Sequence, residues 1–261
     1  MPTGEVMRWS GGKLSTLAKL PGAEHVWALA FDDAAQVLYA GTGPEGKLFR
    51  IDKAGKAQVH FDAEEQHLMS LALAPQRNAG SRVYAGASDK AKLYEVRAPG
   101  RASVLYDFGR TEVRAIVASP RGEIFAIAND IKGGTAPSSR NDAGDDSSTS
   151  SSSKTTGKGV LYRFSRDGSP EQLLENSSEH FTSLALGSDG QPFVGTGVNG
   201  RIYTVDDSHN DVLMADTEER QVGVLSLAGK QRFVTTSDPA MLHPLRGVGD
   251  RDRVAARGLG S

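Results

Sequence analysis

The sequence predicts an all-β fold, and two observations support this prediction. Five similar apolar stretches recur along the 261 residues: HVWALAF at 25, HLMSLAL at 67, EVRAIVA at 112, HFTSLAL at 180 and QVGVLSL at 221. Their spacings are 42, 45, 68 and 41 residues, and apart from the one long interval they match the ~40–45 residues of a four-stranded propeller blade. We therefore expect a β-propeller of four-stranded blades, with about five blades' worth of chain.

The four strands of a unit can be recognised in turn. The first strand, such as WALAF, is small and apolar throughout, which is typical of a strand buried on both faces. A turn rich in Gly, Pro, Asp and Ser follows. The second strand places Gly41, Gly86 and Gly195 at matching positions, where a missing side chain allows blades to approach closely. The third strand alternates aromatic and polar residues, as in KLFRID, and a hairpin such as DKAGK leads to the fourth.

The two ends of the chain resemble parts of blades. Residues 3–20 match the third and fourth strands of a unit, with Gly4 aligned to Gly46, and the last unit supplies a first and a second strand. The count is two strands, four complete sets of four and two more, which makes twenty. Two interpretations stay open: the leading half closes a five-bladed ring with the trailing half, or the chain is a fragment of a larger ring.

The propeller is expected to span residues 1–242, followed by an irregular, disordered tail at 243–261. In that tail Pro244 stands where a strand would need a backbone donor. The long interval comes from a Ser/Gly-rich insertion at 133–159 that contains no aliphatic residue larger than alanine. Such a segment cannot bury enough surface to offset its ordering entropy, so we expect it to be disordered. A tolerated surface insertion is favoured over a flexible lid or a modified tract.

Units such as VLYAGTGPEGKLFRID and PFVGTGVNGRIYTVD resemble, over nearly the whole chain, the YVTN and WD-repeat-like propeller proteins of the myxobacterial type. The Gly-His and Trp-Asp pairs of true WD repeats are missing, which places the chain with the looser class. The resemblance implies a bacterial propeller protein. Members of that class carry a secretion signal and upstream blades, so it also implies a periplasmic or secreted protein if the true amino terminus is missing.

Composition excludes several function classes. With 30 Lys and Arg against 32 Asp and Glu, the formal charge of -2 gives no broad attraction to nucleic acid or anionic lipid. The longest apolar run, VWALAF, is far shorter than the ~18 residues of a membrane-spanning helix. The amino terminus lacks the basic and apolar stretches of a secretory signal, so the chain as written is expected in the cytoplasm. The absence of cysteine excludes disulfides and thiolate sites.

The candidate site residues occupy one repeated position, just before the first strand of each unit. They are His25, His67, Glu112, His180 and Gln221, and we call them the channel-mouth residues because such positions ring the mouth of a propeller's central channel. Histidines with a carboxylate can bind a transition metal or activate water, and any metal would take His25, His67 and His180 as ligands. The favoured alternative is a repeated polar residue that satisfies backbone groups. We therefore predict no catalytic residue, no metal and no cofactor.

Other enzyme signals are weak. The chain has no G-x-S-x-G elbow, phosphate loop or H-E-x-x-H pair. We expect a monomeric, non-catalytic scaffold that binds a protein or small ligand on the face carrying the turns between blades. The alternatives are a metal-assisted lyase or hydrolase at the channel mouth, and a truncated fragment without independent function. Arg8, Arg50 and Arg163 share one third-strand position, where we expect them to be solvated, with ion pairs between blades as the alternative.

Overall fold

The computed structural model describes residues 3–76, 79–131, 157–206, 208–227 and 232–245. These residues form strands and turns, and within them no helix is long and apolar enough to cross a membrane. The predicted tail beyond residue 245 and residues 133–156 of the predicted insertion lie outside the described residues.

Four four-stranded antiparallel sheets follow one another along the chain, and in each the strands pair in sequence order. We call these sheets blades 1 to 4. This arrangement confirms the predicted all-β architecture of four-stranded units. Their strands are β3 (His25–Asp32), β4 (Val37–Gly43), β5 (Lys47–Ile51) and β6 (Ala57–Asp62) in blade 1; β7 (Leu68–Gln76), β8 (Ala79–Ala87), β9 (Lys92–Ala98) and β10 (Arg101–Asp107) in blade 2; β11 (Glu112–Ala118), β12 (Ile124–Ile131), β13 (Gly157–Phe164) and β14 (Pro170–Asn176) in blade 3; and β15 (Phe181–Leu186), β16 (Pro192–Thr196), β17 (Arg201–Val205) and β18 (Asp211–Asp216) in blade 4.

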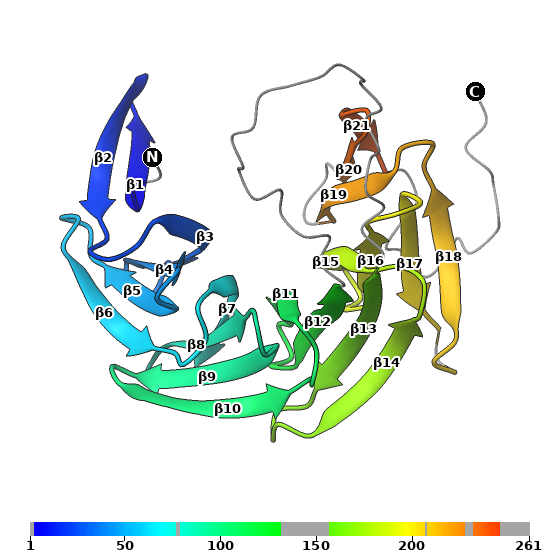
Figure 1. Cartoon of the computed structure of the whole chain (residues 1–261), viewed down its shortest axis with the longest axis horizontal. Coiled ribbons are helices and arrows are strands. Elements are labelled where there is room, and N and C mark those ends of the chain that lie inside the picture. Colours follow the sequence, from blue (N-terminus) through cyan, green and yellow to red (C-terminus); the bar gives the residue numbers. More distant parts are fainter. Residues whose placement is uncertain (1–2, 77–78, 132–156, 207, 228–231, 246–261) are drawn as a thin grey trace, which may run out of the picture.

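Two smaller sheets stand at the ends. The N-terminal hairpin consists of β1 (Glu5–Ser10) and β2 (Lys13–Lys19), and the C-terminal sheet consists of β19 (Gln221–Ser226), β20 (Phe233–Ser237) and β21 (Met241–Pro244). Figure 1 shows the six sheets side by side along an arc, with the N-terminal hairpin and the C-terminal sheet at its two ends. Within the described residues the end sheets share no strand pairing, so the ring is open there and the first of the two interpretations, a closed five-bladed ring, is not formed.

Two strand boundaries differ from the predicted ones. The described residues contain twenty-one strands, one more than predicted, because β21 pairs with the free edge of β20. This strand runs through Pro244, two residues past the expected end at 242, and an edge position tolerates a proline that donates no hydrogen bond. Gly157, Lys158 and Gly159 of the predicted insertion belong to β13, because their backbone pairs with the end of β12 and needs no apolar side chain.

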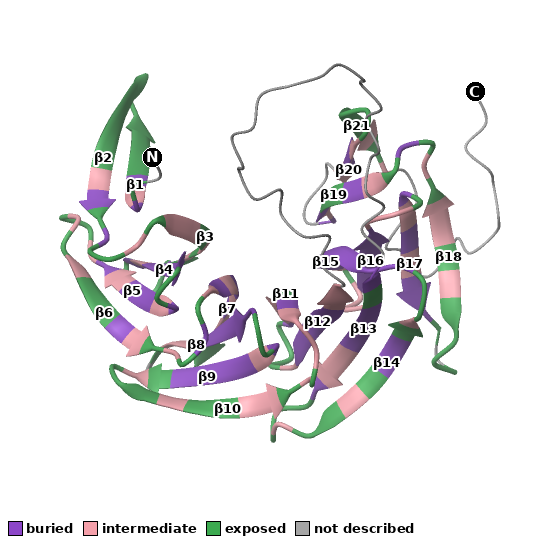
Figure 2. Ribbon diagram, viewed as in Figure 1, coloured by how far each residue is buried: buried purple, intermediate pink, exposed green. Residues whose placement is uncertain are grey.

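Apolar side chains on both faces of each blade form the core. One third-strand position is filled by Leu48, Leu93, Leu161 and Ile202, all 0% exposed. Each packs against the first strand of the following sheet, as Leu48 does with the cluster that contains Leu68. Figure 2 shows this burial along third strands such as β9, whereas the fourth strand β10 at the outer edge is largely exposed or intermediate.

Glycines permit the close approach of neighbouring sheets. A Cβ atom at Gly41 would lie 2.7 Å from the carbonyl oxygen of Leu68 in the next blade, and one at Gly86 would lie 2.6 Å from a methyl carbon of Val113. These contacts confirm the predicted role of the second-strand glycines. Gly46 acts differently: its φ of +57° favours glycine, and a Cβ there would overlap the carbonyl oxygen of Glu65.

Replacing Gly46 by alanine tests this packing against a matched control. Gly46→Ala should lower the free energy of unfolding by about 3 kcal/mol or more, because backbone strain adds to a clash with backbone atoms. Gly100 has a similar φ of +66°, but a Cβ there would meet no atom within 4 Å. Gly100→Ala should therefore cost only about 1–2 kcal/mol. Urea unfolding of both variants gives the comparison, and equal losses would contradict this account.

Candidate functional site

The channel-mouth residues lie where the first strands begin, two just before the strand as predicted and three as its first residue. His25, Glu112 and Gln221 begin β3, β11 and β19, while His67 and His180 directly precede β7 and β15. Among the residues that the structure describes, no three His, Asp or Glu side chains gather as ligands for one metal ion. The structure instead gives each channel-mouth residue its own surroundings, and their role in ligand binding stays a prediction.

His67 is tied to the preceding blade through Trp27. The Trp27 Nε1–H donates to Nδ1 of His67 over 3.1 Å. The two rings meet edge to face with centroids 5.6 Å apart, and Trp27 also lies against His25 with centroids 5.0 Å apart. Because an indole N–H only donates, Nδ1 of His67 accepts and carries no proton. This aromatic group joins blades 1 and 2.

Glu112 is held by a buried asparagine that the sequence analysis did not single out. Asn129 is fully buried and donates through Nδ2 to Oε1 of Glu112 over 2.9 Å. The same amide donates to the Phe181 carbonyl over 2.8 Å and accepts from the Phe181 N–H over 2.9 Å. One side chain therefore satisfies Glu112 and ties blade 3 to blade 4. Its signal in the sequence is an asparagine where the other units have Gly43, Ser88, Gly197 and Ser237.

His180 lies deepest of the channel-mouth residues, at 8% exposure. Its Nδ1 has no hydrogen-bond partner within the described part of the chain. Burial lowers the pKa of His180 below its ordinary 6.5, and the nearby Glu112 carboxylate offsets this only in part. The ring is therefore neutral near pH 7. Gln221 accepts a hydrogen bond from the Ser237 hydroxyl over 3.3 Å.

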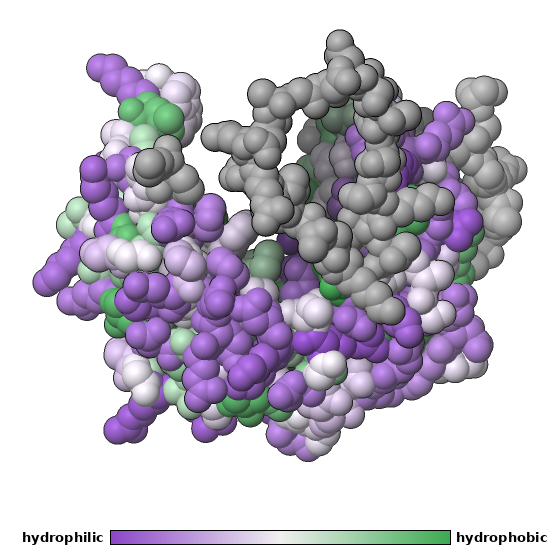
Figure 3. All heavy atoms as spheres, viewed as in Figure 1, coloured by the Kyte–Doolittle hydropathy of each residue, from purple (hydrophilic) through white to green (hydrophobic). Residues whose placement is uncertain are grey.

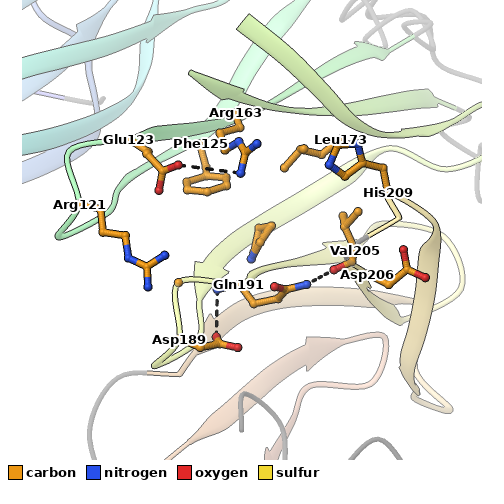
Figure 4. A pocket seen from close by; sticks show the side chains of 12 residues that line it. Arg121, Glu123, Phe125, Arg163, Leu173, Asp189, Gln191, Val205, Asp206 and His209 are labelled. Atoms are coloured by element: carbon orange, nitrogen blue, oxygen red, sulfur yellow. Dashed lines mark hydrogen bonds and ion pairs between the residues drawn. The ribbon is translucent and has the colours of Figure 1, made fainter. Parts of the chain in front are cut away.

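A polar cleft of about 230 Å³ lies between blades 3 and 4. Turns between first and second strands and between third and fourth strands form it, so it opens on the face opposite the channel-mouth residues. Figure 4 shows charged side chains of both signs around it, together with the apolar Phe125 and Leu173. A lining with charges of both signs suits a small polar molecule. Its charged lining residues are Arg121, Glu123, Arg163, Asp189, Asp206 and His209.

Arg163 shows how the cleft is organised. Its guanidinium pairs with Glu171 and lies 3.9 Å from Glu123, and Glu171 also lies 3.3 Å from Nε2 of His209. Both carboxylates that pair with Arg163 belong to its own blade. The alternative that this arginine forms an ion pair between blades is therefore wrong. The sequence did not predict this cleft, because turns from two different units form it. The predicted site also lies on the opposite face.

Comparisons with known proteins bear on the fold. No protein-family model and no curated protein matches the sequence. Similar solved structures include virginiamycin B lyase from Staphylococcus aureus, at 10% identity, TM-score 0.61, and coverage of 94% of this chain and 78% of that one. A nidogen/laminin complex matches at 15% identity, TM-score 0.56, and coverage of 90% and 83%. A gluconolactonase from Xanthomonas campestris matches at 17% identity, TM-score 0.56, and coverage of 84% and 76%.

These neighbours are β-propellers, and at such identities they show the fold alone. The predicted resemblance to propeller repeat proteins is confirmed at that level. The narrower myxobacterial type stays an expectation from the sequence.

Removing the Asn129 amide should be costly. Asn129→Ala should lower the free energy of unfolding by about 2–4 kcal/mol, because the Phe181 N–H and carbonyl lose their partner in a buried place. Asn210 is exposed, and its side-chain amide donates to the exposed Asp206 carboxylate, so Asn210→Ala should change the unfolding free energy by no more than about 0.5 kcal/mol. Chemical denaturation of the two variants measures the difference. A loss at Asn129 no larger than that at Asn210 would refute the proposed tie between blades.

Acidification should destabilise the protein through His180. The folded state keeps this ring neutral, whereas the unfolded chain binds a proton below about pH 6.5. The contribution of His180 to the free energy of unfolding is therefore complete above about pH 6.5, and it is lost as the pH falls below that value. His60 adds a change of the same sign, because burial lowers its pKa as well.

Unfolding free energies at about pH 7.5 and about pH 5.5 test this linkage. His180→Gln should show a smaller loss on acidification than the parent protein. His25→Gln removes a histidine from the same repeat position and serves as the control. An unchanged loss in His180→Gln would show that His180 does not couple folding to pH.

Proposed function

We propose that the chain is a non-catalytic propeller scaffold that binds a protein or small ligand on the face carrying the turns between blades. The observation that supports this is the fixed state of the channel-mouth residues. His67 accepts from Trp27, Glu112 accepts from Asn129, and Gln221 accepts from Ser237. Three of the five predicted site residues thus have structural partners.

Hydrogen bonds hold two of these side chains in one orientation. The Trp27 N–H occupies one nitrogen of His67, and the Asn129 amide occupies an oxygen of Glu112. Side chains held in this way form a rigid polar rim, and a rigid rim loses little conformational entropy when a ligand binds.

A metal-assisted lyase or hydrolase at the channel mouth is the second candidate. Two observations favour it: the similar structures include virginiamycin B lyase and gluconolactonases, and Nδ1 of His180 has no partner within the described residues. Histidine nitrogens are the ligands through which such a site would bind a transition metal.

Metal analysis and turnover assays separate the two candidates. The scaffold proposal expects protein purified without a histidine tag to hold no stoichiometric metal, and to convert neither gluconolactone nor virginiamycin B. Stoichiometric metal that is lost in a His25/His67/His180 triple glutamine variant would support the enzyme instead. Saturable turnover abolished by His67→Gln would also overturn the scaffold proposal, provided that the variant's melting curve shows a folded protein.

A further inference from the structure

The visible face of blades 2 and 3 is mostly polar. Figure 3 shows hydrophilic residues, in purple, over these blades at the bottom of the view, with apolar residues in small groups between them. A ligand site in this part of the molecule must therefore be recognised by its shape and its charges. The polar cleft between blades 3 and 4 offers both, and the proposed function does not use it.

Two turns that form this cleft are closed by their own hydrogen bonds. In the turn between β11 and β12, Ser119 donates its N–H to the Glu123 carbonyl over 2.8 Å, and the Ser119 hydroxyl accepts from the Glu123 N–H over 3.1 Å. In the turn between β15 and β16, Gly187 donates its N–H to the Gln191 carbonyl over 2.8 Å. Residues held in this way lose little conformational entropy when a ligand binds. The cleft is therefore a preformed site.

The size of the cleft limits its ligand to a small molecule. Its volume of about 230 Å³ is below the ~300–1,000 Å³ of pockets for drug-sized ligands. Phe125 and Leu173, which are 3% and 7% exposed, give the cleft an apolar wall. Figure 4 shows Arg121 and Glu123 at one end of the cleft and His209 at the other. A small ligand can thus touch charged groups and the apolar wall together.

Arg121 brings a free positive charge to its end of the cleft. The residue is exposed, and its backbone carbonyl accepts a hydrogen bond from Arg166. Its guanidinium forms no ion pair and no hydrogen bond within the described residues. A guanidinium recognises a carboxylate through two parallel hydrogen bonds. Arg121 is therefore suited to the carboxylate of a ligand.

Glu123 brings an acceptor to the same end of the cleft. Its Oε2 accepts from the Ser119 hydroxyl over 3.4 Å, whereas its Oε1 lies 3.9 Å from Nη1 of Arg163, beyond hydrogen-bond distance. Arg163 donates instead through Nε to Glu171 over 2.9 Å. Oε1 of Glu123 is therefore able to accept a hydrogen bond from a ligand cation.

The charges around the cleft select a ligand that carries both signs. Among the described residues, three carboxylates and two arginines line it. The carboxylates would repel a simple anion, and Arg121 would repel a simple cation, because like charges brought together are costly. A zwitterion has no net charge and can satisfy Arg121 and Glu123 together. Free α-amino acids are the commonest small molecules of this kind.

We propose that the cleft binds a free α-amino acid with an uncharged side chain. The ligand carboxylate pairs with the Arg121 guanidinium, and the ligand ammonium donates to Oε1 of Glu123. Gln191 adds a second acceptor, because its amide nitrogen donates to the Val205 carbonyl and leaves its oxygen available. The ligand side chain lies against the apolar wall. The cleft opens on the face opposite the channel-mouth residues, so this proposal goes beyond the proposed function.

L-Alanine and L-leucine are the probes, and calorimetric titration of the full chain measures their affinity. Each has two matched analogues: the decarboxylated amine keeps only the ammonium, and the deaminated acid keeps only the carboxylate. At least one of the two amino acids should bind about tenfold or more tightly than either of its analogues, because each analogue loses one charge-assisted contact. Hydrogen exchange should slow in residues 119–123 and 187–191 when the amino acid binds.

Two variants assign the contacts. Arg121→Gln should remove the preference for the amino acid over its decarboxylated amine, and Glu123→Gln should remove the preference over its deaminated acid. Arg101→Gln, at an exposed arginine in blade 2, should leave binding unchanged. Melting curves show that each variant is folded. The proposal is overturned if neither amino acid binds, if the analogues bind as tightly, or if folded Arg121→Gln keeps the parent preference. None of these results depends on the channel-mouth residues.

Discussion

Packing of sheet on sheet is the constraint on which the rest of the structure depends. Each blade has apolar side chains on both faces, and full burial of one leucine or isoleucine contributes about 1.5–3 kcal/mol. Leu48, Leu93, Leu161 and Ile202 are buried only because another sheet follows each of their blades. A unit of this kind is therefore stable only beside its neighbours. The same constraint leaves apolar surface at the ends of the arc, where a neighbouring sheet is missing.

Polar residues near the inner strands serve this packing as well. Ser70 donates its hydroxyl to the Val113 carbonyl over 2.8 Å, and Thr182 donates to the Val222 carbonyl over 2.5 Å. Each bond joins one blade to the next sheet, as the Asn129 amide does. A first strand buried on both faces must still satisfy its backbone groups, and these side chains donate to carbonyls of the next first strand. Repetition of polar residues there is therefore as much a sign of structure as of chemistry.

The sequence was sufficient to predict the four strands of each unit and their order, because the pattern of apolar and polar residues and the turn residues repeat in each unit. It also indicated the close approach at Gly41 and Gly86, since a glycine repeated inside a strand is typical of a place where another backbone comes near. It missed β21, whose Met241–Pro244 segment has no repeated counterpart and forms by pairing with a free edge. The role of Asn129 and the cleft beside Arg163 depend on which side chains of different units meet. Spacing within a unit carries no such information.

The order of the sheets along the chain has a mechanical consequence. Within the described residues no strand crosses from one sheet into another, and neighbouring sheets pack through side chains such as Leu48 and Leu68. A force that pulls the two ends of the arc apart therefore loads the sheets in series. A released unit of 42 residues would contribute roughly 140–150 Å of extended chain. The protein would extend in steps set by the repeat spacings, with one longer step where the spacing is 68 residues.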